Sequence, residues 1–256
     1  MSEFTTLQES YNLARSTANT YNNNIMAKRS KRYIKAAELV DSTKTYGIEA
    51  AVEILKNFPA PKFDPTVTLS FNMGIDPRKS DQMVRGSVSL PNGTGKDVKV
   101  IVFATGDAAK AAEAAGANEV GLEELIKKVQ GGYTDFDVAI ATPSAMTEVR
   151  KIARVLGPRG LMPNPKTGTV TDDVASAIDK VKAGSINYKL DKNAVIAAGI
   201  GKASFTQAKI VENATALLES VVKAKPASAK GNYIQSVTIA SCMNPGIKLE
   251  ASLYAL

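Results

Sequence analysis

The hydrophobic pattern of this chain changes twice along its length, and that change limits the possible folds more than any other feature. Residues 67–73 alternate apolar and polar side chains, which is the period of a strand with one buried face. Residues 98–104 and 136–141 are instead largely continuous apolar runs that alternate with helical patterns, as buried parallel strands do. After residue 184, strands of mixed polarity return. A small parallel βαβ unit is therefore expected to interrupt a second unit that is built differently.

We predict an α/β fold with two domains. The first is an α+β domain with a mixed sheet, and it combines residues 26–93 with residues 184–256. The second is a Rossmann-like βαβ domain with a parallel sheet, inserted at residues 94–183. The turn-forming residues 91–95 mark the first hinge between them.

The beginning of the chain differs from the rest in composition. Residues 1–25 are rich in Asn, Thr, Ser and Tyr and lack an apolar period, so we predict a disordered N-terminal extension. Met26 then begins a basic arm. The cations of this arm are Lys28, Arg29, Lys31 and Arg32. On pattern alone, the arm is either a nucleic-acid contact or a solvated charge run before a helix.

The net charge of +7 is unevenly distributed along the chain. Residues 26–93 carry 11 basic and 7 acidic side chains, and residues 184–256 carry 8 and 4. The middle segment, residues 94–183, carries 12 of each. Because the excess positive charge lies on both flanks, we expect the flanks to form one body that binds a polyanion.

Two residue types that serve most enzymes are scarce here. The chain has no histidine, and its single cysteine, Cys242, can form neither an internal disulfide nor a zinc cluster. The sequence also lacks an 18-residue apolar run and a secretory leader. We therefore predict a cytoplasmic protein without catalytic activity, cofactor or metal, and we expect neither a membrane nor a small-molecule substrate among its partners.

A nucleotide-dependent α/β enzyme that uses the inserted domain is the competing hypothesis. Its motifs are incomplete, because Asp97 follows the glycine-rich turn and Lys96 where a phosphate-binding loop requires Ser or Thr. Residues 201–204 fail as well, since Ile196 stands in place of the first glycine of that loop. A βα nucleotide site at residues 104–106 lacks the three-glycine fingerprint. Nucleotide turnover by RNA-free protein would favour this alternative.

Six short stretches match a known family in their order along the chain. They are KFD at 62–64, GIDPRKSDQ at 74–82, VRG at 84–86, GPRGLMPNPK at 157–166, GKASF at 201–205 and MNP at 243–245. With these motifs the chain resembles the ribosomal protein L-one family, in its bacterial type. The resemblance extends from Met26 to about Glu250.

The resemblance implies a fold and a function. In this family a discontinuous domain binds RNA, and the inserted domain is joined to it by two hinge crossings. The family also implies that the protein binds large-subunit rRNA at the mobile stalk, assists the release of deacylated tRNA from the exit site, and represses its own messenger. The expected partners are therefore the rRNA stalk, exit-site tRNA and the operon's messenger RNA, with a ribosome-associated location.

Motif matching carries the family's RNA-contact surface onto positions in both flanks. These are Lys62, Phe63, Thr66, Asp191, Lys192, Lys202, Ser236, Cys242, Met243 and Asn244. Lysines would neutralise phosphates, and short polar groups would bond the 2′-hydroxyls that distinguish RNA. From the residues alone, Phe63 is equally compatible with a core position, and Asp191 with Lys192 is compatible with a turn that holds a local ion pair.

The closing loop departs from the family pattern at two positions. This chain has Asn244 where the family has glycine, and Cys242 where it has threonine. We expect Asn244 to adopt the left-handed backbone conformation in place of glycine. RNA binding is then expected to be retained but weaker, with the double change Cys242→Thr and Asn244→Gly tightening it by about 1 kcal/mol, the scale of one net hydrogen bond.

Overall fold

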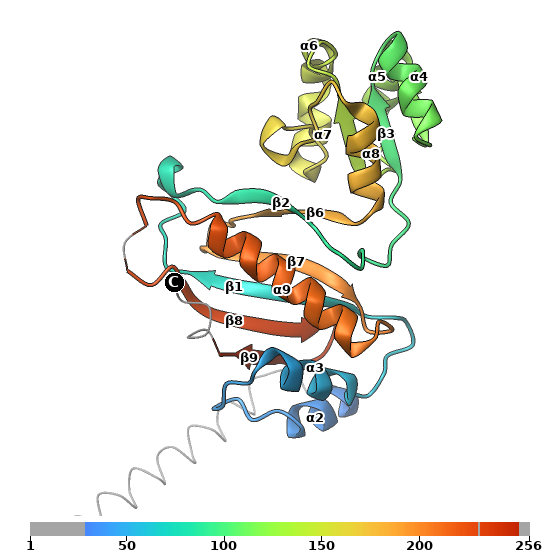
Figure 1. The fold of residues 1–256 in the computed structure, drawn as a ribbon. Coiled ribbons are helices and arrows are strands. Elements are labelled where there is room, and N and C mark those ends of the chain that lie inside the picture. Colours follow the sequence, from blue (N-terminus) through green and yellow to red (C-terminus); the bar gives the residue numbers. More distant parts are fainter. Residues whose placement is uncertain (1–28, 230, 251–256) are drawn as a thin grey trace, which may run out of the picture.

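The computed structural model describes residues 29–229 and 231–250 (Figure 1). The predictions for residues 1–25 and for Lys28 lie outside the described residues. Three sheets organise the described chain: a four-stranded sheet, a two-stranded ribbon and a three-stranded sheet. No helix of the described part is long and apolar enough to cross a membrane.

The four-stranded sheet is built from both flanks of the sequence. Its strands are β1 (Thr66–Met73), β7 (Val195–Lys202), β8 (Ile234–Ser241) and β9 (Gly246–Leu249), in the order β7-β1-β8-β9. All three pairings are antiparallel, and a parallel bridge between Tyr46 and Leu249 at the β9 edge makes the sheet mixed. The α/β class is therefore confirmed, with parallel pairing in this sheet limited to one bridge.

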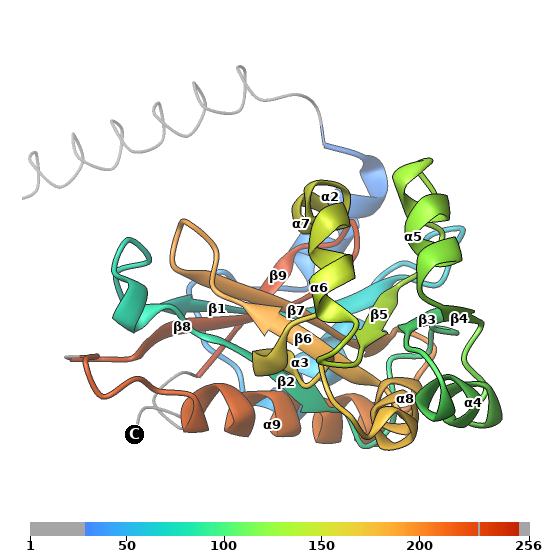
Figure 2. The same cartoon turned by 90° about the horizontal axis from the view of Figure 1, so that it is seen from above.

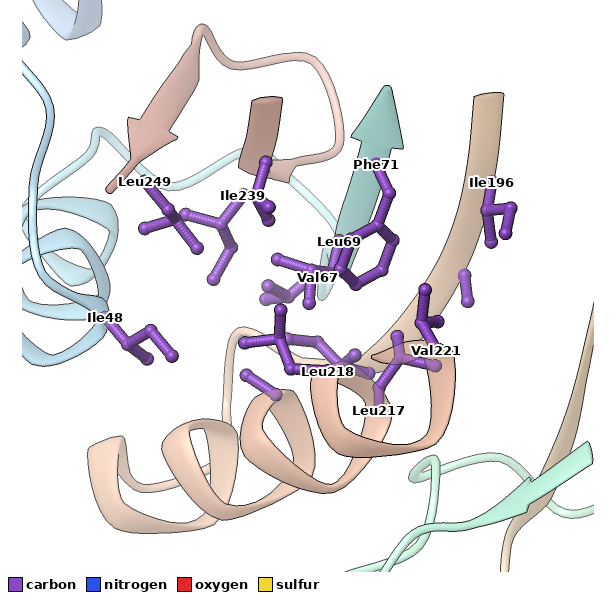
Figure 3. Close-up of a cluster of buried hydrophobic side chains, with 14 of the residues drawn as sticks. Ile48, Val67, Leu69, Phe71, Ile196, Leu217, Leu218, Val221, Ile239 and Leu249 are labelled. Carbon is purple, nitrogen blue, oxygen red and sulfur yellow. The ribbon is translucent and has the colours of Figure 1, made fainter. Parts of the chain in front are cut away.

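One face of this sheet is packed against helices. The helices are α3 (Ile48–Lys56) and α9 (Gln207–Lys223), and Figures 1 and 2 show α9 lying along one side of the strands. A further helix, α2 (Lys31–Glu38), lies beyond the β9 edge in Figure 1, and its Ala36 is buried in the same core. Val67, Leu69 and Phe71 alternate along β1, and all three are fully buried in the core of Figure 3. Each such side chain contributes about 1.5–3 kcal/mol through removal from water. The helical spacing of Leu217 and Val221 in the sequence predicts a helix at about 206–223, and α9 confirms it, because both side chains face this core.

The middle of the chain forms the three-stranded parallel sheet. Its strands are β3 (Val100–Phe103), β4 (Glu119–Gly121) and β5 (Val138–Ala141), in the order β4-β3-β5. Helices cover both faces: α5 (Glu123–Gln130), α6 (Met146–Val149) and α7 (Ala153–Arg159) lie on one side, and α4 (Asp107–Ala114) and α8 (Val174–Lys182) on the other (Figure 2). Successive residues of β3 are all buried, which explains why this segment is apolar without alternation.

The remaining elements differ in part from the expected ones. The sequence predicts a strand at residues 87–90, and β2 (Arg85–Ser89) begins two residues earlier. It pairs with β6 (Ser185–Lys189) in a separate antiparallel ribbon. The three prolines and three glycines of residues 157–168 predict an ordered loop. That prediction is wrong for the first residues, which form the last turn of α7; this helix is capped by Gly160 with φ 74°. The chain also has three short 3-10 helices among the described residues: η1 (Ser80–Gln82), η2 (Arg150–Ile152) and η3 (Pro165–Thr167).

The two crossings between the middle segment and the flanks lie against each other. A Cβ added to Gly184, which has φ 101°, would stand 2.4 Å from Cα of Gly93, so the backbones approach too closely for a side chain. The fully buried Asn213 of α9 connects this crossing to the flanks through hydrogen bonds. Its Oδ1 accepts from the amide of Asn92 at 3.1 Å, and its Nδ2 donates to the carbonyls of Gly93 (3.0 Å) and Ile200 (2.7 Å).

Candidate nucleic-acid interface

The face of the four-stranded sheet opposite the helices carries small polar side chains. On β1 these are Thr66, Thr68, Ser70 and Asn72, which are half-buried or exposed while their neighbours are buried. The register places Asn72 beside Ser236, Ser70 beside Thr238 and Thr68 beside Ala240 of β8. The stripe along β1 is roughly 20 Å long at the rise of an extended strand. Its hydroxyl and amide groups both donate and accept hydrogen bonds, as recognition of RNA 2′-hydroxyls requires.

Several predicted site residues meet at the end of the sheet where β1 begins. Thr66 pairs with Lys202 across β1 and β7, and Lys202 Nζ donates to Thr66 Oγ1 at 3.3 Å. The amide of Cys242 donates to the carbonyl of Thr66 at 3.0 Å. The start of β1, the end of β7 and the loop after β8 therefore form one continuous surface.

The basic arm reaches the same surface. Ser30 begins α2 by accepting a hydrogen bond from the amide of Tyr33 on its hydroxyl, and Arg29 lies over the Tyr33 ring at 4.9 Å. Arg32 Nη2 donates to the carbonyl of Met243 at 3.2 Å. Lys31 is exposed beside it. Arg32 thus connects the start of α2 to the closing loop, and the nucleic-acid contact of the arm stays a prediction.

Phe63 and Lys62 both face solvent on the segment that leads into β1. The Phe63 side chain is 47% exposed, so the alternative that placed it in the core is wrong. Lys62 is exposed next to it. The following Asp64 accepts hydrogen bonds from the amide of Ser204 at 3.2 Å and from its hydroxyl at 2.7 Å, which attaches this segment to the end of β7.

Asp191 and Lys192 lie at the opposite end of the sheet, in the turn between β6 and β7. The amide of Asp191 donates to the carbonyl of Val195 at 2.8 Å, and the amide of Ala194 donates to the carbonyl of Asp191 at 3.1 Å. This confirms the turn but not the ion pair, which is absent among the described residues. Ser236 is nearer to this end, so the polar stripe of β1 joins the two groups of predicted residues.

The structure corrects the expected conformation of the closing loop. Met243, with φ 64°, occupies the left-handed region, whereas Asn244 does not. The Asn244 amide donates to the carbonyl of Ser241 at 3.0 Å, and its Nδ2 donates to Ser241 Oγ at 3.1 Å. Among the described residues, Asn244 Oδ1 and Arg32 Nη1 are buried and have no hydrogen-bond partner.

Cations are used differently in the two regions. Four of the six ion pairs of the described chain lie within residues 94–183, and none of the six includes a cation of the candidate interface. The four are Lys99–Asp135, Lys110–Asp107, Lys128–Glu119 and Lys151–Glu148. Hydrogen bonds from Lys128 and Tyr133 hold the pKa of Glu119 below its usual value. The middle segment therefore neutralises its own charges, while the interface cations stay available to phosphates.

Sequence reasoning missed the polar stripe itself. Thr68, Ser70, Asn72 and Thr238 were not among the expected contacts, although the first three are the polar half of the alternation that predicted β1. The described residues contain no group of three or more His, Cys, Asp or Glu side chains placed to hold a metal ion. Cys242 is a free, exposed thiol.

Comparison with known proteins identifies a family. The model of the Ribosomal protein L1p/L10e family matches residues 55–245. The large ribosomal subunit protein uL1 of Nocardia farcinica is 56% identical over 225 residues, which cover 88% of this chain and 95% of that protein. The protein of the same name from Lactobacillus delbrueckii subsp. bulgaricus is 54% identical over 225 residues and is covered to 97%.

Proposed function

The chain belongs to the Ribosomal protein L1p/L10e family, and we propose that it is a structural constituent of the large ribosomal subunit that binds rRNA through its flanks. As a ribosomal protein it acts in the cytoplasm, on the ribosome, and has no catalytic role. The observation that carries the proposed site is the open polar face of the four-stranded sheet, bordered at one end by cations that have no ion-pair partner among the described residues.

The structure supports a division of labour within this function. The core of the flanks is formed by residues between Ala36 and Val84 and between Tyr188 and Leu249, and the two cores of the middle by residues between Val100 and Val181. We therefore propose that residues 26–93 and 184–256 form the RNA-binding domain and residues 94–183 an inserted domain. Two finer roles belong to this proposal through the family resemblance: release of deacylated tRNA at the mobile stalk, and repression of the protein's own messenger.

Neutralising the interface cations tests the RNA-binding site. The triple variant Arg32→Gln, Lys62→Gln and Lys202→Gln removes three phosphate contacts, so the slope of log affinity against log salt should fall by about 2.7 for duplex RNA if it follows the B-DNA relation. We expect the affinity for a large-subunit rRNA fragment at physiological salt to fall by about a hundredfold, at roughly 1 kcal/mol per contact. Filter-binding titrations over a salt series measure both quantities.

A matched triple variant in the middle segment controls for net charge. Lys99→Gln, Lys110→Gln and Lys151→Gln lower the net charge by the same amount, but each of these cations is already paired with a carboxylate. This variant should bind within about threefold of the unchanged protein, because distant charges are screened beyond roughly 8 Å. Equal losses for the two triple variants would show that binding follows total charge, and the proposed site would then be wrong.

The messenger-repression role has its own test. A messenger site that resembles the rRNA site would compete for the same surface. Adding the protein to a translation reaction programmed with its operon messenger should reduce synthesis, and excess rRNA fragment should restore it. Repression that survives the interface triple variant would contradict a shared surface.

A further inference from the structure

Two cavities of ≈ 360 Å³ each lie between the β2/β6 ribbon and the middle segment. In Figure 1 the ribbon lies between the middle segment and the four-stranded sheet. None of the residues that line these cavities is among the predicted RNA contacts. The two cavities share Val138, Thr167, Thr169 and Asn187 in their walls, so they form one cleft. Each volume falls within the range of about 300–1,000 Å³ that is usual for small-ligand sites.

The ribbon presents its polar face to this cleft. Val88 and Ile186 are paired across β2 and β6, and both pack against the core of the flanks. The alternate positions of the same strands line the cleft, as the period of a strand requires. They are Arg85, Ser87, Ser185, Asn187 and Lys189.

Two like charges stand directly opposite each other on this polar face. Arg85 pairs with Lys189 in the register of β2 and β6, and both line the first cavity. Neither cation takes part in an ion pair among the described residues. Like charges at directly opposite positions destabilise a sheet. An anion between the two cations removes this repulsion, so the ribbon is arranged for a negatively charged occupant.

The charge of the whole cleft favours the same kind of occupant. Among the described side chains, three cations and two carboxylates line it: Arg85, Lys180, Lys189, Asp137 and Asp173. Asp137 Oδ2 already accepts a hydrogen bond from a backbone amide at 3.2 Å, and Asp173 lies in the second cavity, away from Arg85 and Lys189. The first cavity is therefore the positive part of the cleft.

The opposite wall is formed largely by residues 160–169, which include most of a family motif to which RNA binding gives no role. Hydrogen bonds within this loop hold its shape. The amide of Asn164 donates to Thr169 Oγ1 at 2.8 Å, and Thr167 Oγ1 donates to the carbonyl of Asn164 at 3.0 Å. The cleft is thus enclosed by two preformed walls, and its volume suits a small molecule, whereas a polynucleotide strand extends over several such volumes.

We propose that a small phosphorylated anion binds in the first cavity, between the ribbon and residues 160–169. The planar guanidinium of Arg85 donates to two oxygens of one phosphate, and the Lys189 ammonium neutralises further charge. The Asn187 amide, which lines both cavities, donates at the other side of the anion. Because the anion contacts both walls, it stabilises the arrangement in which the middle segment rests on the ribbon. This site goes beyond the proposed function and does not depend on it.

Pyrophosphate tests the site in the absence of RNA. Isothermal titration calorimetry at constant ionic strength measures its affinity for the full chain and for variants. The double variant Arg85→Gln and Lys189→Gln should bind about tenfold more weakly or worse, because hydrogen bonds to two charged groups are lost. Lys189→Arg keeps both charges and should bind within about twofold of the unchanged protein.

A matched control separates the site from net charge. Arg78→Gln with Lys209→Gln removes one arginine and one lysine from exposed positions outside the cleft, so this variant should bind pyrophosphate as the unchanged protein does. Without pyrophosphate, the cleft double variant should melt no lower than the unchanged protein, because the repulsion between Arg85 and Lys189 is relieved. If it does not fold, the single change Lys189→Gln at an exposed position should still weaken binding about fivefold.

Hydrogen exchange tests whether the anion contacts both walls. Pyrophosphate should slow the exchange of amides in β6 and in residues 160–169 of the unchanged protein, and it should have no such effect on the cleft double variant. Equal affinity of the cleft double variant and the unchanged protein would overturn the proposal, because binding would then be a general anion effect. It is also overturned if neither pyrophosphate nor inorganic phosphate binds, or if only a short oligouridylate does, which would assign the two cations to a polynucleotide. Protection confined to β6 would contradict the contact with the middle segment.

Discussion

The four-stranded and the three-stranded sheet differ in how their faces are covered and in how nearby charged side chains are paired. In the three-stranded sheet, helices cover both faces, and lysines of the surrounding surface pair with nearby carboxylates. In the four-stranded sheet, helices cover one face only, and the other presents hydroxyl and amide groups with cations at its end. A sheet that keeps one face open retains a surface for a partner, whereas a sheet buried on both faces must place recognition elsewhere.

The largest expected effect comes from separating the two regions. Replacing residues 94–183 with a short Gly-Ser linker should leave RNA affinity within about tenfold, because the excess charge lies outside that segment. The isolated middle segment should bind at least a hundredfold more weakly than the whole protein at the same salt, as expected for roughly two or more lost phosphate contacts. Filter binding with one rRNA fragment compares the three proteins. Equal RNA affinity of the isolated middle segment and the whole protein would show that the flanks are not the RNA-binding region.

The junction between the two regions should show the next largest effect. Asn213→Leu removes three hydrogen bonds, one buried and two half-buried, and takes the Asn213 partner from the amide of Asn92 and from the carbonyls of Gly93 and Ile200. We expect the free energy of unfolding to fall by about 3 kcal/mol or more. Urea denaturation followed by circular dichroism measures the change.

A variant that removes only one hydrogen bond, in the middle segment, serves as the comparison for Asn213→Leu. Asn118 Oδ1 accepts one hydrogen bond, from the amide of Val100 at 2.8 Å. Asn118→Ala should therefore cost only about 1 kcal/mol. If Asn213→Leu proved no more costly than Asn118→Ala, Asn213 would not be what holds the junction.

Removing hydroxyl groups from the open face of the four-stranded sheet should lower RNA affinity by a smaller amount, with little effect on the stability of the fold. Thr68→Val, Ser70→Ala and Thr238→Val together remove three hydroxyls while keeping the shapes of the side chains nearly constant. RNA affinity should fall by roughly tenfold, since each net hydrogen bond is worth about 0.5–1.5 kcal/mol and only part of the stripe contacts RNA at once. The melting temperature should fall only slightly, because the one internal hydrogen bond lost is that from Thr68 Oγ1 to the carbonyl of Ala240 at 3.3 Å. Substituting 2′-deoxyribose in the RNA should weaken binding of the unchanged protein and have less effect on the variant, and Thr147→Val in the middle segment serves as the control.

The smallest effect is expected at the beginning of the chain. Starting the protein at Met26 should change the free energy of unfolding by less than about 0.5 kcal/mol, the usual range for changes away from packed features. RNA affinity should be unchanged, because the cations of the basic arm are retained. Thermal denaturation and filter binding measure both quantities. A clear loss of affinity would extend the binding region into residues 1–25.

Local patterns in the sequence determined the elements and much of their arrangement. Alternation at residues 67–73 predicted β1, helical spacing predicted α9, and the apolar runs predicted the buried parallel strands. These features depend on which side of an element faces water, and the side chains of the element itself decide that. The uneven charge likewise indicated a polyanion partner without any structure.

Only the tertiary structure decided how distant residues combine. The contact of Arg32 with Met243, separated by 211 positions, and the meeting of Phe63 with Asn244 around one cavity depend on the packing of α2 and the ends of β1 and β8. It also assigned the left-handed conformation to Met243, although a family pattern pointed to its neighbour. Backbone conformation in such a loop is set by the contacts that hold it on both sides, and those contacts exist only after the chain has folded.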